Sequence, residues 1–154
     1  MIAYIIQTLM GAIGAVGFAI LFNVPRKQLP LFFIGGALDW AVYLVCVHNG
    51  CSEFLGMLFA TMTAALSSEI LARLIHAPVL ILIVPMLVPL IPGSSLYRSM
   101  DALVRSQKAE FFAHGSAAII SAGAICLGII CMTAVTKTIF TVWDHIRKQR
   151  HCAQ

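Results

Sequence analysis

An uncharged apolar run that prolines interrupt four times places the strongest constraint on this fold. The run covers residues 77–97, APVLILIVPMLVPLIPGSSLY, and its prolines are Pro78, Pro85, Pro89 and Pro92, four of the six in the chain. Each proline inside a helix removes an N–H donor and clashes with the preceding turn. In lipid, the carbonyl groups that such a break frees must face other protein or a water-filled cavity. The run therefore predicts a broken membrane segment beside a polar cavity.

The composition leaves too little polar surface for a domain that folds in water. Of 154 residues, 60% are hydrophobic and 10% are charged, whereas soluble domains carry about 25% charged residues. The mean hydropathy is +0.95. We expect an all-α, polytopic membrane helix bundle of about five transmembrane helices, with a proline-broken fourth segment. Residues 1–140 would form one transmembrane domain, and residues 141–154 would form a basic cytoplasmic tail.

Five apolar runs define the expected spans. They cover residues 2–22, 29–47, 54–74, 77–97 and 111–135. The first run lacks the basic start and the cleavage site of a secretory signal, so we expect it to be a retained span. Between the fourth and fifth runs, residues 99–110 predict a short interfacial helix on which Asp101 and Arg105 share a face.

The distribution of lysine and arginine predicts the orientation. With five spans, one side receives seven of the ten cations and the other side receives three. The seven are Arg26, Lys27, Arg73, Lys137, Arg147, Lys148 and Arg150. Because cytoplasmic loops carry the excess of lysine and arginine, we place the C-terminus in the cytoplasm and the N-terminus outside.

Several function classes lack their signals in this sequence. The net charge of +4 comes from cations at the ends of apolar runs, without the aromatic–basic stripe of a nucleic-acid-binding surface. The five cysteines are an odd number in apolar surroundings, which does not describe a disulfide framework. We find no phosphate-binding loop, no Ser/His/Asp set and no metal-ligand spacing. We therefore expect no enzyme, no catalytic residue, no cofactor and no metal.

Asp39 stands near the middle of the second apolar run, after Gly35 and Gly36. A carboxylate at the bilayer centre costs about 2.5–3.5 kcal/mol on insertion scales, so such groups face protein or water and are usually functional. Low-dielectric surroundings favour the neutral form of a carboxyl group, which suits Asp39 to carrying a proton. The alternative is a structural carboxylic acid that is hydrogen-bonded to a neighbouring helix.

The third run carries a second polar group. Glu69 and Arg73 are four residues apart, in the order that favours an ion pair on a helix. Thr63 and Ser67 share one face and could line a polar path, although hydroxyl groups in membrane helices often bond to their own backbone. A structural ion pair and a polar lining both stay open at this point.

The end of the broken run offers the sharpest candidate for a binding site. Pro92, Gly93, Ser94 and Ser95 precede a helix that we expect to begin near Leu96, with either serine as its N-cap. A helix N-terminus presents free N–H groups and a partial positive charge to an anion such as a carboxylate. The adjacent Tyr97 is a further candidate. The alternative is a plain loop followed by an interfacial anchor.

Two stretches together resemble a known family. Gly17-Phe18-Ala19-Ile20-Leu21-Phe22-Asn23-Val24-Pro25 and Pro85-Met86-Leu87-Val88-Pro89-Leu90-Ile91-Pro92-Gly93-Ser94-Ser95-Leu96-Tyr97 are similar to the small, C-terminal-type module of the bacterial threonine/serine exporter family. The resemblance covers residues 11–135.

The resemblance implies a multi-pass subunit in the bacterial inner membrane that exports threonine or serine, with coupling to the proton gradient expected. In that family the module is fused behind a larger membrane module or encoded beside it, and this chain is similar to the separately encoded half. The expected partner is the larger subunit, with a homo-oligomer as an alternative. A related branch is associated with export of dicarboxylates such as succinate. A non-transporting scaffold subunit is the alternative from another class.

Overall fold

The computed structural model describes residues 2–152, and the side chains of these except Ala3 and residues 141–152. The described chain is helical throughout and contains no strand, which confirms the predicted fold class. The α-helices are α1 (Ile2–Leu21), α2 (Leu29–His48), α3 (Glu53–Ile75), α4 (Val79–Leu87), α5 (Gly93–Val104) and α6 (Lys108–Cys152), and the short 3-10 helices are η1 (Arg26–Gln28) and η2 (Val88–Leu90).

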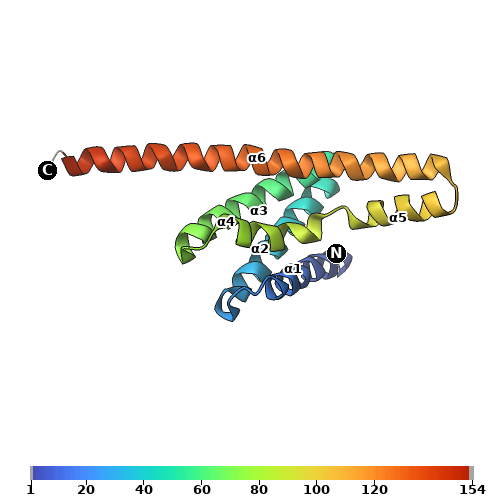
Figure 1. The fold of residues 1–154 in the computed structure, drawn as a ribbon, viewed down its shortest axis with the longest axis horizontal. Coiled ribbons are helices and arrows are strands. Elements are labelled where there is room, and N and C mark those ends of the chain that lie inside the picture. The colour runs from blue at the N-terminus through green and yellow to red at the C-terminus, as the bar shows by residue number, and fades with distance from the viewer. Residues whose placement is uncertain (1, 153–154) are drawn as a thin grey trace.

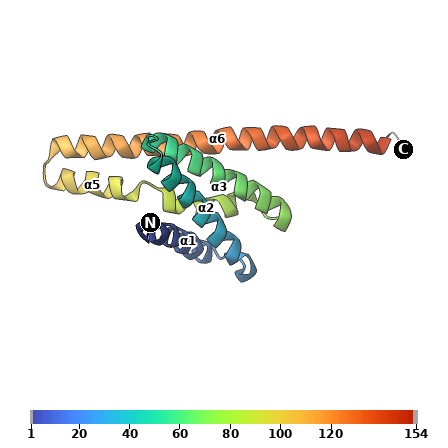
Figure 2. The same ribbon diagram turned by 180° about the vertical axis from the view of Figure 1, so that it is seen from behind.

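The helices form a four-helix body with a long rod beside it. Figures 1 and 2 show α1, α2, α3 and α4 packed together, with α6 passing across this body and projecting beyond it at both ends. α5 leads away from the body, and the first part of α6 returns along it. The body and the α5–α6 hairpin are therefore joined at the break between α4 and α5.

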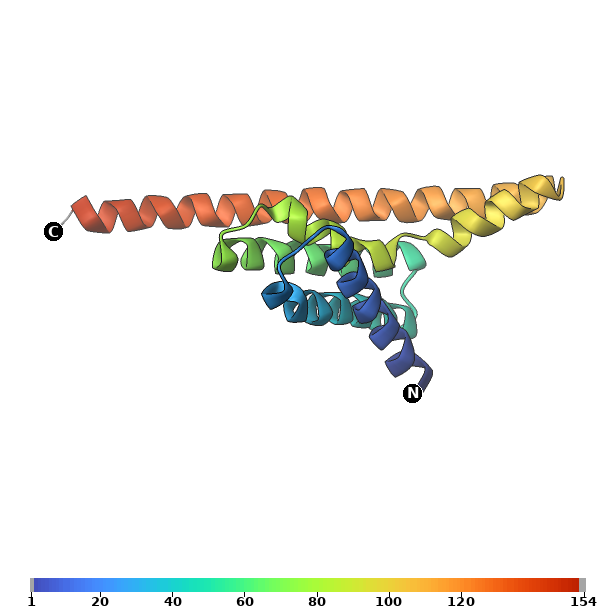
Figure 3. The same cartoon turned by 60° about the horizontal axis from the view of Figure 1, so that its bottom comes forward.

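Helices α3 and α6 run in the same direction, side by side. A Cβ on Gly128 would lie 2.9 Å from the Cβ of Thr61. The guanidinium carbon of Arg73 lies 3.3 Å from the ring centroid of Phe140. Both contacts join residues with the same offset (128 − 61 and 140 − 73 are both 67). By this register, the first residue of α6 lies 12 residues (53 + 67 − 108), or about 18 Å, beyond the start of α3. Figure 3 shows α6 extending past the helices of the body.

The number of spans agrees with the predicted number when the broken segment is included. Within the described residues, four helices are long and apolar enough to cross a membrane: α1, α2, α3 and the Lys108–Phe140 part of α6. The segments Val79–Leu90 and Gly93–Val104 meet at a bend of 56°, and they make a fifth candidate when the pair is counted as one broken span. The 9 residues of α4 reach only about 14 Å, so α4 cannot cross a bilayer of about 30 Å alone.

Two predicted boundaries are wrong. The interfacial helix expected over residues 99–110 is divided between α5 and α6, because Ser106 adopts a left-handed conformation (φ +60°) that ends α5. Asp101 and Arg105 share a face as expected and form an ion pair, with Arg105 Nε 3.0 Å from an Asp101 carboxylate oxygen. The fifth run is part of a longer helix, since α6 continues to Cys152. The side chains of the expected basic tail, residues 141–154, lie outside the described residues.

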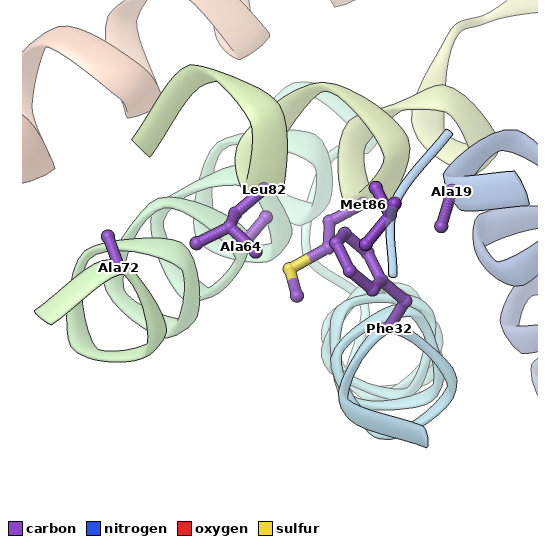
Figure 4. Close-up of a cluster of buried hydrophobic side chains, with 7 residues drawn as sticks. Ala19, Phe32, Ala64, Ala72, Leu82 and Met86 are labelled. Carbon is purple, nitrogen blue, oxygen red and sulfur yellow. The ribbon is translucent and has the colours of Figure 1, made fainter. Parts of the chain in front are cut away.

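Small residues bring the helices of the body into close contact. Gly35 of α2 faces Met86 of α4, and Gly36 faces Ala15 of α1. A buried cluster fills the space between these helices, and Figure 4 shows Phe32 and Met86 within it. Its members are Ala19, Val24, Phe32, Ala64, Ala72, Leu82 and Met86. Membrane helices that pack through small residues gain van der Waals contact along their backbones.

Replacing Gly36 with valine is expected to separate α1 from α2. A Cβ at this position would lie 2.6 Å from the Cβ of Ala15 and 3.3 Å from the carbonyl oxygen of Gly11, so backbone as well as side chain would have to move. Overpacking of this kind costs about 1–3 kcal/mol. We expect the detergent-solubilised variant to melt several degrees lower. Gly17→Val is the matched control, because no atom lies within 4 Å of its Cβ position; equal melting of both variants would contradict this packing.

Candidate functional site

Asp39 lies inside the helical body. Its exposed fraction is 1%, and neither carboxylate oxygen has a hydrogen-bond partner among the described residues. Gly36 and Gly35 precede it by three and four residues and so share its face of α2. These glycines contact Ala15 of α1 and Met86 of α4, which places Asp39 on the face of α2 that meets both helices.

Trp40 is a polar candidate that the sequence analysis did not single out. Its indole nitrogen Nε1 is buried and also lacks a hydrogen-bond partner among the described residues. The side chain packs against a cluster of Met57, Ala60, Leu90 and Ala124, and its ring centroid lies 5.4 Å from that of Tyr43. The sequence feature that could have indicated Trp40 is its position directly after Asp39, a carboxyl group in an apolar run.

The break between α4 and α5 reaches the same part of the body. η2 packs against α1, α2 and α3, and Leu90 is 1% exposed. A Cβ on Gly14 of α1 would lie 3.8 Å from Pro89. Since Trp40 packs against the cluster that contains Leu90, the unwound segment lies beside the helix that carries Asp39.

The structure corrects two details of the expected binding motif. α5 begins at Gly93 rather than near Leu96, so Ser94 and Ser95 occupy its first turn and neither is the N-cap. The N-cap is Pro92, whose side chain has no hydrogen-bond donor or acceptor. Proline is tolerated at the start of a helix because the N–H that it lacks makes no helical hydrogen bond there. Gly93 has no positive φ; among the described glycines, a positive φ occurs at Gly50.

The exposure of the motif changes along its length. Pro92 is buried, Gly93 and Ser94 are exposed, Ser95 is half-buried and Tyr97 is 73% exposed. The Gly93 N–H donates to the carbonyl oxygen of Ile91. The following N–H groups belong to the first turn of a helix, where no carbonyl four residues earlier accepts them within the helix. They are accessible donors for an anion.

The hydroxyl groups of α3 are used by their own helix. Thr63 Oγ1 donates to the carbonyl oxygen of Phe59 at 2.9 Å, and Ser67 Oγ donates to that of Thr63 at 2.7 Å. Thr63 also lines an open groove of about 510 Å³ whose other walls are apolar. The groove does not include Asp39 or the residues of the break.

Glu69 and Arg73 form the expected ion pair. Arg73 Nη2 lies 3.6 Å from Glu69 Oε2, and the guanidinium group also covers the ring of Phe140 on α6. The ion pair itself lies within α3, and the contact of Arg73 with Phe140 joins α3 to α6. We interpret both contacts as structural.

A buried carboxyl group beside a proline-broken helix is an arrangement typical of membrane transporters, which bind substrates and coupling ions where helices are interrupted. The chain matches the family model described as Threonine/Serine exporter, ThrE, over residues 7–135, and it belongs to this family. It is a membrane protein by its family and its apolar helices.

One relative shows how this module compares with a longer chain. The protein is 30% identical over 105 residues to an uncharacterized protein from Haemophilus influenzae. The match covers 68% of this chain and 35% of the relative, so this chain spans about a third of that protein's length. No solved structure matches the chain.

Proposed function

We propose that this protein is a subunit of a secondary transporter in the bacterial inner membrane that exports small carboxylate metabolites, threonine and serine first. Membership of the exporter family supports the reaction class. The observation that carries the proposal is Asp39, a buried carboxyl group without a partner in the described structure, on the helix that packs against the break.

The N-terminus of α5 is the proposed binding site for the carboxylate of the substrate. Backbone N–H groups of Ser94 and Ser95, which follow Gly93, provide donors that are already oriented along the helix axis, and the helix dipole adds a partial positive charge. The exposure of Gly93 and Ser94 supports access to them. Pro92 sets the start of the helix, and Tyr97 lies one turn further along α5.

Asp39 is the proposed proton-coupling residue. An exporter gains energy from the proton gradient when protons enter the cell as substrate leaves. A single carboxyl group that opens in turn to each side of the membrane can carry the proton inward. The burial of Asp39 supports this role, because it keeps the proton from crossing without a change of conformation.

The proposed partner is the larger membrane subunit of the same family. The H. influenzae relative has most of its length outside the match, which supports a module that works beside further chain. A homo-oligomer is the alternative assembly. Dicarboxylate export stays the alternative substrate class, since a helix N-terminus also binds a dicarboxylate, and a scaffold subunit is the alternative from another class.

Export in cells with and without the gene for the larger subunit tests this proposal. We expect threonine and serine export when both chains are present and none when this chain is expressed alone. The measurement is the extracellular concentration of each amino acid, with succinate as the comparison. Full transport by the purified chain alone in liposomes would refute partner dependence, and unchanged export of every substrate with both chains present would refute the exporter function.

A further inference from the structure

Three buried polar atoms stand out because nothing bonds to them. Among the described side chains, the buried nitrogen and oxygen atoms without a hydrogen-bond partner are Oδ1 and Oδ2 of Asp39 and Nε1 of Trp40. All three belong to two consecutive residues in the middle of α2. Buried polar groups are nearly always hydrogen-bonded, and leaving one unsatisfied costs free energy. Their concentration at one place indicates a ligand.

The three atoms present complementary chemistry. The carboxylate of Asp39 accepts hydrogen bonds and carries a negative charge, whereas the indole N–H of Trp40 only donates. An α-amino acid offers the reverse set on adjacent atoms: an ammonium group that donates and a carboxylate that accepts. A dicarboxylate offers acceptors alone, and it would place further negative charge beside Asp39.

Helix α1 and η2 border these atoms. A Cβ on Gly11 of α1 would lie 3.2 Å from Trp40, so the α1 backbone passes directly over that side chain. Trp40 also packs against the cluster that contains Leu90 of η2. The two open grooves described at the surface do not include Asp39 or Trp40. The three atoms are themselves buried, so access to them requires α1 or η2 to move.

Few charged side chains belong to the elements that contact α2. η1 contributes Arg26 and Lys27, which precede the first residue of α2. α1, α4 and η2 contain no Asp, Glu, Lys, Arg or His. On α3, Glu53 is the first residue, and Glu69 is paired with Arg73 near the other end. On α2 itself, His48 is the last residue and Tyr43 is one turn from Asp39.

We propose that Asp39 and Trp40 bind the substrate as a zwitterionic amino acid, with the Asp39 carboxylate accepting from the ammonium group and the Trp40 indole N–H donating to one carboxylate oxygen, while the N–H groups at the start of α5 bind the other. The inference rests on the proposed exporter function and adds Trp40 as a substrate-binding residue. It also makes the ammonium group and the proton competitors for one carboxylate. Protonation of Asp39 then releases the amino acid, so that a proton is exchanged for the substrate.

Tryptophan fluorescence tests this pairing directly. The chain contains two tryptophans, so full-length Trp143→Phe protein in lipid nanodiscs leaves Trp40 as the emitter. We expect L-threonine to shift the Trp40 emission, and N-acetyl-L-threonine and succinate to leave it unchanged because they lack the ammonium group. A shift with succinate or N-acetyl-L-threonine as large as with threonine would overturn the inference, as would no shift with any of the three.

Calorimetric titration with L-threonine separates this inference from the exporter function. Trp40→Phe keeps an aromatic ring and removes the N–H, and a lost hydrogen bond to a charged group weakens binding by about tenfold to a hundredfold. Tyr43→Phe, on the neighbouring ring, is the matched control and should bind like the unsubstituted protein. Normal threonine binding by Trp40→Phe would overturn the role of Trp40 and leave the exporter function standing. Absence of amino acid export from cells would defeat the function itself.

Discussion

Asp39→Asn is expected to abolish export while the protein still inserts in the membrane and assembles with its partner. Asparagine has nearly the same shape, so the contacts of α2 with α1 and α4 should persist. It cannot ionise or bind a proton, so the proposed coupling step is lost. The measurement is extracellular threonine and serine from cells that also express the larger subunit, together with co-purification of the two chains.

Asp101→Asn serves as the control for this substitution. Asp101 is a carboxylate on α5 that pairs with Arg105 at an exposed position. Exposed ion pairs of this kind contribute little to stability, so export should be unchanged. Normal export by Asp39→Asn would contradict the proton-coupling role. Loss of co-purification would instead assign Asp39 to packing and assembly.

Gly93→Val is the second substitution for which we expect complete loss of export. A Cβ at this position meets no atom within 4 Å, so the larger side chain should leave the fold intact. It would stand in front of the first N–H groups of α5 and prevent close approach of a substrate carboxylate. The same export assay measures the loss, and the melting temperature in detergent checks the fold.

Two milder variants accompany Gly93→Val. Gly93→Ala places only the Cβ in the same open space, and Ser94→Ala removes a hydroxyl group while keeping every backbone N–H. Because backbone groups do most of the proposed binding, we expect Ser94→Ala to retain most export and Gly93→Ala to fall between the two. Export by Gly93→Val at the rate of the unsubstituted protein would rule out this binding site.

The three N-terminal helices could be predicted closely from the sequence. Apolar runs expected over residues 2–22, 29–47 and 54–74 correspond to α1, α2 and α3 within one residue at each end. The expected ion pair of Glu69 and Arg73 is present, and Asp101 and Arg105, which were expected to share a helix face, are also paired. Apolar length and spacing along one helix are local properties, and so the sequence alone carries them.

The arrangement of the broken segment could not be predicted in this way. Prolines mark where a helix can break, but they do not set the 56° bend or the return of α5 along α6. These depend on contacts between distant residues, such as Ser99 Oγ with the carbonyl oxygen of Phe111 at 3.3 Å. Trp40 was missed for a similar reason: only the packing of several helices shows that its indole nitrogen is buried and unpartnered.

The length of α6 ties the geometry of the site to the thickness of the bilayer. Its candidate span, Lys108–Phe140, has 33 residues, or about 50 Å, against a hydrocarbon core of about 30 Å. Such an excess is accommodated by tilting the helix or thickening the lipid around it. α5 packs on the first part of α6 and α3 packs further along it. A change in the angle between α6 and the body would therefore move the start of α5 relative to Asp39, so we expect bilayer thickness to affect the distance between the two proposed binding groups.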